Sequence, residues 1–188
     1  FTIRYVDGGY ESMEDLQDGF IHGGFGIHLG VEDPLLGKRS WGNGESYLLW
    51  LNVDFRPETK ENFPQHYGFR AQVYQSESST KMDLVRSPLV TQDPVLSRFA
   101  YQDYVSLDLL AALDYWGIDV NLRDFEKFLY QDTPINIKVN ARTGEVGVKD
   151  PTAPIRFYFP VDPRVLRGDY VSLRTNGLAT SYDSFMVK

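Results

Sequence analysis

Three histidines are the side chains of this chain best suited to bind a metal ion. His22 and His28 are six residues apart, and this even spacing places both on one face of a regular strand. Glu32, Asp33 or His66 could complete a site of imidazole and carboxylate ligands. Histidines this sparse are also typical of ordinary polar positions beside glycine. We therefore predict no metal ligand and no cofactor.

Paired carboxylates could serve glycoside hydrolysis, which requires two carboxyl groups roughly 5 to 10 Å apart across the sugar. Glu14 with Asp15 and Asp54 with Glu58 are candidate pairs, but a chain with 26 acidic residues contains such pairs by chance. The sequence has no Gly-x-Ser-x-Gly motif, phosphate loop or complete dinucleotide glycine fingerprint. We predict no catalytic residue, and a carboxylate-dependent hydrolase remains an alternative.

Aromatic side chains are abundant at 14% of the chain, and their rings can stack on sugars or pack in protein interfaces. Trp41 lies in the polar, glycine-containing stretch KRSWGNGES, where an exposed ring and a ring folded back on a sheet are both reasonable. Tyr47 and Trp50 follow in the next segment. We predict Trp41, Tyr47 and Trp50 as the binding residues.

The stretch PVDPRVLRGDYVSL, residues 160–173, has the composition of a rigid corner that leads into a strand. Its two prolines fix the backbone, and Gly168 suits a position where φ is positive or a side chain would clash. The stretch resembles the bacterial GDYxxLxY proteins, a membrane-associated group, through Gly168, Asp169, Tyr170 and Leu173, although Thr175 replaces their final tyrosine. This resemblance implies no known chemistry.

The opening RYVDGGYESMEDLQDGF resembles the start of pertussis-type ADP-ribosyltransferases. The matching residues are Arg4, Asp7, Gly19 and Phe20, and Gln75-x-Glu77 would correspond to the catalytic Gln-x-Glu of that family. The resemblance implies binding of a nicotinamide dinucleotide and a glutamate that holds the ribose. The family's Ser-Thr-Ser strand is missing here. A divergent ADP-ribosyltransferase is therefore a second enzymatic alternative.

The segments that position these residues read mostly as strands. Alternation of apolar and polar residues predicts strands at 1–6, 46–55, 67–75, 155–159, 169–174 and 182–188, and a further pair of strands within 135–148 that is joined by a turn at ARTG. The five glycines of GFIHGGFGIHLG favour a bulged strand or a loop, because a helix tolerates few of them. A short helix is expected at 10–20. The segments 46–55 and 67–75 together predict a long hairpin.

Residues 106–130 change to a helical pattern of two helices and a turn. Ser106 and Asn121 are the expected N-caps, and Gly117 is expected just past the end of the first helix. We therefore predict an α+β fold, mainly antiparallel β and β-sandwich-like, with a helix-turn-helix insertion at about 106–130. The chain suits a single domain, 1–188, with a sub-division into 1–84 and 104–188 as the alternative.

Composition limits the classes of partner. The formal net charge of −7 disfavours nucleic acid, and the longest apolar run, about five residues, is far below the roughly 20 that span a bilayer. We predict a non-enzymatic binding or assembly module, outside the cytoplasm, with a protein or carbohydrate partner and no membrane insertion. A structural subunit of a capsid, pilus or other assembly, or a homo-oligomer, is the further alternative.

Overall fold

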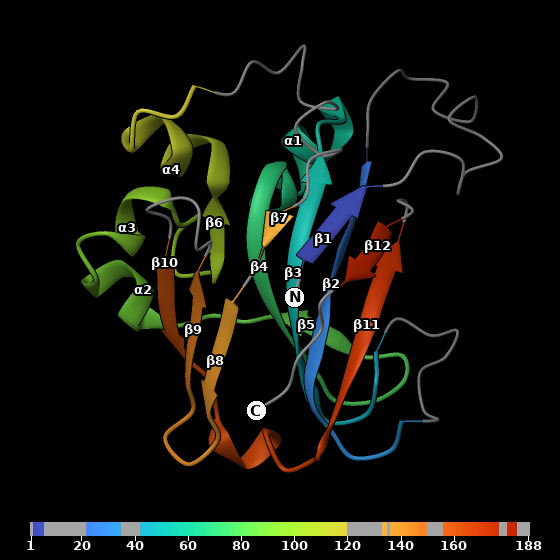
Figure 1. Ribbon diagram of the computed structural model, residues 1–188. Helices are drawn as coiled ribbons and strands as arrows, with labels where there is room; N and C mark the ends of the chain where they lie inside the picture. Colours follow the sequence, from blue (N-terminus) through green and yellow to red (C-terminus); the bar gives the residue numbers. More distant parts are fainter. Residues whose placement is uncertain are drawn as a thin grey trace, which may run out of the picture.

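The strands of the computed structural model form three antiparallel sheets (Figure 1). The structure describes residues 2–5, 22–34, 42–119, 133–134, 136–149, 156–176 and 180–183. The largest sheet has the order β11-β2-β3-β4-β5, and β6 also pairs with β4. Its strands are β2 (His22–Val31), β3 (Ser46–Asp54), β4 (Gly68–Ser76), β5 (Met82–Leu84), β6 (Ser106–Asp108) and β11 (Tyr170–Asn176).

Two smaller sheets have three strands each. One has the order β10-β9-β8 and the other β12-β1-β7. Their strands are β8 (Asn136–Asn140), β9 (Glu145–Lys149), β10 (Arg156–Pro160), β1 (Thr2–Tyr5), β7 (Thr133–Pro134) and β12 (Thr180–Asp183). Every pairing among the described strands is antiparallel. The prediction of a mainly antiparallel α+β fold is confirmed.

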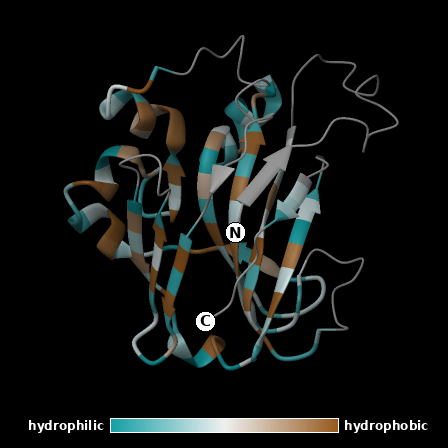
Figure 2. Ribbon diagram, in the orientation of Figure 1, coloured by the Kyte–Doolittle hydropathy of each residue, from teal (hydrophilic) through white to brown (hydrophobic). Residues whose placement is uncertain are grey.

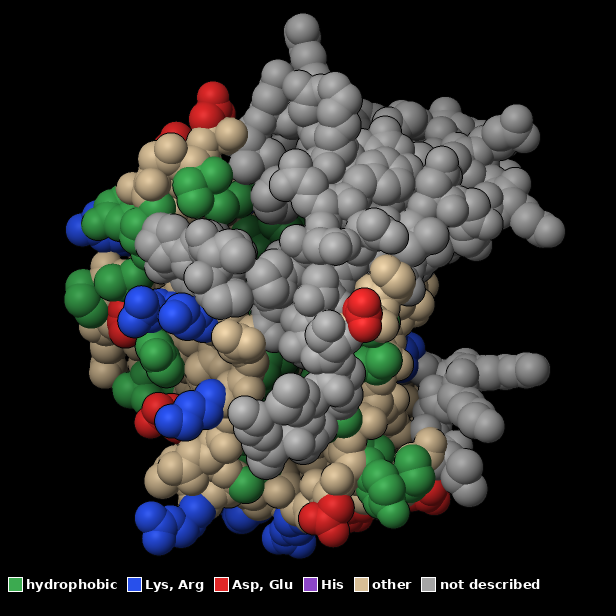
Figure 3. Space-filling view, viewed as in Figure 1, with side chains coloured by type: hydrophobic (Ala, Val, Ile, Leu, Met, Phe, Trp, Pro, Cys, Tyr) green, Lys and Arg blue, Asp and Glu red, His purple; other side chains and the backbone are tan. Residues whose placement is uncertain are grey.

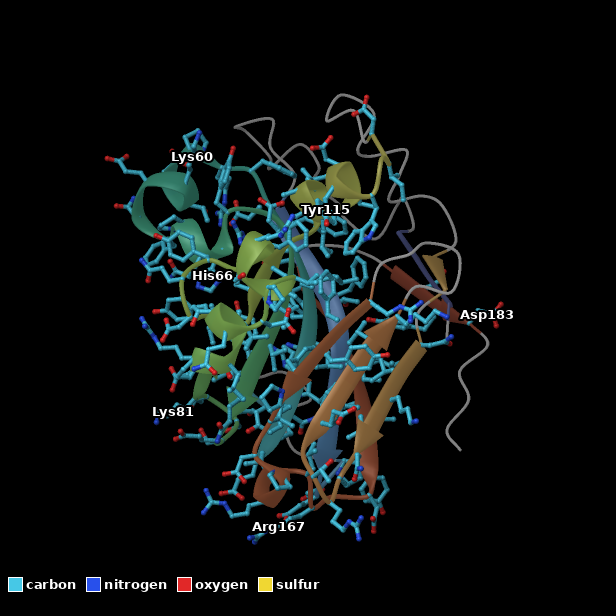
Figure 4. The ribbon with its side chains drawn as sticks, turned by 90° about the vertical axis from the view of Figure 1, so that its left-hand side faces the viewer. Lys60, His66, Lys81, Tyr115, Arg167 and Asp183 are labelled. Atoms are coloured by element: carbon cyan, nitrogen blue, oxygen red, sulfur yellow. The ribbon has the colours of Figure 1, made fainter. Side chains whose placement is uncertain are left out.

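The core lies between the largest sheet and the layer in front of it. That layer includes the β8–β10 sheet, which Figure 4 shows to the right of the large sheet, on the opposite side from Lys60 and His66. Phe25 and Leu49 from the large sheet belong to the same buried cluster as Val146 and Phe157 from the small one. Along β8–β10, apolar and polar residues alternate (Figure 2), so each strand buries one face.

The helices are short and lie mainly in connections. They are α1 (Pro57–Asn62), α2 (Pro88–Gln92), α3 (Leu96–Phe99) and α4 (Leu109–Tyr115), with single turns of 3-10 helix at η2 (Pro64–His66) and η4 (Pro163–Val165). Residues 85–103, which separate the two parts of the alternative sub-division into 1–84 and 104–188, contribute Val90, Leu96 and Phe99 to the core. This segment therefore packs as part of the same body as the large sheet.

The predicted cap of the first helix at 106–130 is wrong. Ser106 lies in β6, opposite Gln72 of β4, and the helix begins only at Leu109 because the Asp108 side chain accepts a hydrogen bond from the N–H of Ala111. Gly117 follows the helix with a positive φ of 76°, as expected of a glycine that ends a helix. The predicted helices at 121–130 and 10–20 lie outside the described residues.

The glycine-rich segment is strand β2, and its glycines make room for a tryptophan. A Cβ atom added to Gly24 would overlap the ring of Trp50, and one added to Gly26 would overlap the backbone of Leu49. Trp50 lies opposite Gly26 in the β2–β3 pairing. The glycines are therefore required by close packing within the sheet.

The predicted rigid corner connects two sheets. β10 ends at Pro160, η4 begins at Pro163, and β11 starts at Tyr170, so the chain passes here from the small sheet to the large one. Pro160 lies on an edge strand of its sheet, where the missing N–H is tolerated. Pro163 occupies the first turn of η4, where the fixed φ of proline is suitable.

Candidate functional site

The predicted binding residues Tyr47 and Trp50 are buried. Tyr47 is 2% and Trp50 is 3% exposed, because both faces of β3 are covered in this structure. The hydroxyl of Tyr47 accepts a hydrogen bond from the backbone N–H of Asp162, at 2.9 Å, so this side chain fastens the corner to the large sheet. Neither ring is available to stack on a sugar. Trp41 lies outside the described residues.

His28 has a structural environment. Its Nδ1 atom lies 3.0 Å from the hydroxyl of Ser46, which donates its own proton to the carbonyl of Asn43, so Nδ1 of His28 is the donor in this pair. The Nε2 atom has no hydrogen-bond partner within the part of the chain that the structure describes. Burial, with a smaller effect of Arg174, lowers the pKa of His28 to about 4.

His66 belongs to a different cluster, on the side of the large sheet that faces away from the small sheet (Figure 4). Its Nδ1 atom lies 3.0 Å from the hydroxyl of Tyr74 and 3.1 Å from the amide nitrogen of Gln72. The Gln72 amide also donates to the hydroxyl of Ser106, which donates to the carbonyl of Gln65. These groups mostly satisfy one another, as buried polar groups must.

Burial sets the protonation of this cluster. It lowers the pKa of His66, although the hydrogen bond from Gln72 and the charge of Asp54 partly oppose this effect. Burial also raises the pKa of Tyr74. Both side chains are therefore neutral near pH 7, and the cluster joins β4, β6 and η2 without a free nucleophile.

The histidines do not combine into a metal site among the described residues. His28 and His66 have separate partners, and the side chain of His22 lies outside the described side chains. No group of three His, Cys, Asp or Glu residues within the described ranges is arranged to hold a metal ion. Glu32 and Asp33 are exposed.

Asp54 is a structural carboxylate. Burial alone would raise the pKa of this group, but hydrogen bonds from Arg56 and Thr59 outweigh burial and lower it. The two oxygens accept bonds from the backbone and guanidinium of Arg56 and from the Thr59 hydroxyl. Glu58, the second carboxylate of the candidate pair, is exposed. Glu14 and Asp15 lie outside the described residues.

The residues of the ADP-ribosyltransferase resemblance lie on different sheets. Arg4 belongs to β1, whereas Gln75 belongs to β4 and Glu77 follows that strand. Glu77 forms an exposed ion pair with Lys81, with 2.5 Å between Oε2 and Nζ. The side chain of Arg4, and residues Asp7, Gly19 and Phe20, lie outside what the structure describes.

An exposed aromatic ring lies instead on the sheet formed by β8, β9 and β10. Tyr158 of β10 is 54% exposed and faces outward, while its neighbours Phe157 and Phe159 are buried in the core. Gly147 of β9 lies opposite Tyr158. A Cβ atom added to Gly147 would come within 2.9 Å of Cε1 of the Tyr158 ring. The ring therefore lies over Gly147, and a larger residue at this position would require the ring to move aside.

The outward side chains around this ring form what we call the Tyr158 face. Its members are Asn136, Lys138, Asn140, Glu145, Gly147, Lys149, Arg156, Tyr158 and Pro160. All except Gly147, which the ring covers, are exposed. Figure 3 shows blue Lys and Arg side chains near a hydrophobic one over these strands, with red acidic side chains next to them. The arrangement offers one ring surface bordered by cationic and amide hydrogen-bond donors.

The register places the charges of this face. Lys149 lies directly opposite Arg156 on one side and Asn136 on the other, and Lys138 lies opposite Gly147. Within the described residues, none of the three cations forms an ion pair. Glu145, at the far end of β9, is the carboxylate of this face.

Sequence reasoning missed Tyr158 although the pattern IRFYF was identified as a strand. Alternation by itself places Phe157 and Phe159 on one face, so an outward-facing Tyr158 could have been predicted from the sequence. The position of Gly147 under the ring depends on the strand register, which alternation does not supply.

Comparisons with protein-family models, with curated proteins and with solved structures found no match to this chain. Among the described residues, no helix is sufficiently long and apolar to cross a membrane.

Proposed function

We propose that this protein is a non-enzymatic binding module that binds carbohydrate on the Tyr158 face. The observation that carries the proposal is the exposed ring of Tyr158, positioned over Gly147 in the middle of a sheet face. An aromatic ring provides an apolar surface for the C–H groups of a sugar. Amide and cationic side chains of the same face, such as Asn136 and Lys138, are suited to bind hydroxyl groups. A location outside the cytoplasm suits this function and stays a prediction.

Replacement of Tyr158 tests this proposal. Tyr158→Ala should weaken binding to soluble polysaccharides by about tenfold or more, because loss of one stacking ring at a binding site costs on the order of 1–3 kcal/mol. Binding is measured by the retardation of the native protein in gels that contain each polysaccharide. Tyr170→Ala is the matched control, since Tyr170 is 50% exposed on another sheet. If the two substitutions weakened binding equally, the Tyr158 face would be excluded as the binding site.

Assembly through strand β11 is a second candidate function. Among the described strands, β11 pairs only with β2 and ends the large sheet. Val171 and Leu173 of this edge strand are 38% and 46% exposed. An open edge with apolar side chains is a site for strand addition. A second copy fits, because antiparallel pairing about a two-fold axis at Leu173 would place Leu173 opposite its own copy and Val171 opposite Thr175.

Light scattering at increasing protein concentration tests this assembly. We expect the mass to rise from monomer to dimer, and Leu173→Lys should keep the protein monomeric because it places two cations opposite each other. Leu89→Lys is the control, since Leu89 is 52% exposed on α2. A monomer at every concentration, or dimers that persist in Leu173→Lys, would contradict assembly through β11.

A further inference from the structure

The Tyr158 face concentrates positive charge on a protein that is acidic as a whole. The chain has a formal net charge of −7, yet Lys138, Lys149 and Arg156 lie on one face of three short strands. Lys149 and Arg156 are direct cross-strand neighbours. Like charges in directly opposite positions destabilise a sheet. The arrangement is therefore unfavourable for folding and requires another explanation.

Neighbouring carboxylates do not neutralise these cations within the described part of the chain. Glu145 is paired in register with Asn140 and Pro160, four residues along β9 from Lys149. No ion pair joins Glu145 to Lys138 in the structure, although the two residues are diagonal neighbours. The positive charge of the face therefore remains available to a ligand.

We propose that the ligand of the Tyr158 face is an acidic saccharide, which stacks a sugar ring on Tyr158 and pairs its carboxylate or sulfate groups with Lys138, Lys149 and Arg156. This inference rests on the function proposed above. Arg156 is two residues from Tyr158 on the same strand, roughly 7 Å away along the backbone. Long cationic side chains span such a distance, so one residue of an acidic saccharide contacts the ring and a cation together.

The chemistry favours an acidic saccharide over other anions. The acidic side chains of a peptide supply charge but no ring surface to stack on Tyr158, so a peptide would need a further apolar residue there. A single-stranded nucleic acid could stack a base on the ring, but its long phosphate backbone would also pass the acidic remainder of the protein, where it is repelled. A saccharide combines a ring surface with charges that need not extend beyond the cationic face.

Two pairs of ligands that differ only in charge test the inference by isothermal titration. Polygalacturonate is compared with its methyl ester, and dextran sulfate with dextran, so the pairs also distinguish carboxylate from sulfate. We expect the charged member of at least one pair to bind at least tenfold more tightly than its neutral partner. This preference should shrink as salt is added, because salt screens exposed charges.

Variants with altered charge test whether the Tyr158 face is responsible for the preference for acidic ligands. The double variant Lys149→Gln and Arg156→Gln should bind the preferred acidic ligand about tenfold more weakly, since two ion pairs at the surface are lost. The double variant Lys60→Gln and Lys81→Gln changes the net charge equally at other sites and should bind as the parent does. The first variant should melt no lower than the parent, because it removes a like-charge pair, so weaker binding would not reflect unfolding.

The outcomes separate this inference from the proposed function. If charged and neutral polysaccharides bound with equal affinity, and Tyr158→Ala lost this binding, the preference for an acidic ligand would be wrong. The proposal of carbohydrate binding would still hold. Absence of binding to all four polysaccharides would overturn both. Equal losses in the two double variants would indicate non-specific attraction and overturn the inference. Tighter binding of an oligothymidylate than of any polysaccharide would replace it with nucleic-acid binding.

Discussion

At the scale of single residues, His28 makes the stability of the fold depend on pH. Burial holds the pKa of the folded state at about 4, whereas an unfolded histidine titrates near 6.5. At pH 7 the side chain is neutral in both states. Below about pH 6.5 the unfolded chain takes up a proton that the folded chain excludes, so the free energy of unfolding falls until the pH reaches about 4.

We expect His28 to account for a loss of about 2 kcal/mol in the free energy of unfolding between pH 7 and pH 5. Chemical denaturation at several pH values measures this loss. His28→Gln has no titrating group at this position, so its stability should depend less on pH by that amount, whatever its stability at pH 7. The pH dependence of His66→Gln should be compared with that of His28→Gln, because burial also lowers the pKa of His66. A pH dependence in His28→Gln equal to that of the parent would disprove this role.

At the scale of elements, Gly168 fixes the corner between β10 and β11. A Cβ atom added at Gly168 would overlap the carbonyl group of Val31 and the backbone nitrogen of Glu32. The N–H of Gly168 donates to the carbonyl of Gly30, at 3.3 Å. Close approach to the end of β2 is therefore the reason for glycine here, which confirms one of the two reasons that the sequence suggested.

Gly168→Val should lower the free energy of unfolding by about 1–3 kcal/mol, because two backbone segments must separate to admit the side chain. Arg167→Ala should change it by less than about 0.5 kcal/mol, since Arg167 is exposed and surface substitutions have small effects. Chemical denaturation compares the two variants. If Gly168→Val were as stable as the parent but lost binding to a partner, the corner would be a recognition element.

At the scale of the whole molecule, the choice between enzyme and binding module depends on how the elements are combined. The polar clusters around His28, His66 and Asp54 are used mainly in hydrogen bonds within the protein. The Tyr158 face, in contrast, is an exposed surface with charges that lack ion-pair partners among the described residues. This contrast supports a binding module.

Titration with a nicotinamide dinucleotide tests the enzymatic alternative. We expect no measurable heat of binding, because Arg4 and Glu77 belong to different parts of the fold, and Glu77 is paired with Lys81. The same titration of Arg4→Ala is the control. If the parent bound the dinucleotide and Arg4→Ala abolished that binding, the ADP-ribosyltransferase interpretation would replace the binding module.

The sequence by itself determined the local elements of this protein. Alternation predicted the β3–β4 hairpin and the strands that became β8–β11, because period two is a property of consecutive residues. It also placed Tyr47, Leu49 and Val53 on one face of β3. All three are buried in the core, although Tyr47 was predicted to be a binding residue. The rigid corner was predicted for the same reason, since proline and glycine act on their own backbone.

The tertiary structure decided which residues meet. Alternation placed Trp50 on the second face of its strand, but the packing of its ring over Gly24 and its cluster with Tyr74 and Met82 depend on the tertiary structure. In the same way, the Tyr158 face exists because register sets Tyr158 over Gly147 and Arg156 beside Lys149. Register arises from contacts between distant segments, so a pattern read along one strand cannot supply it.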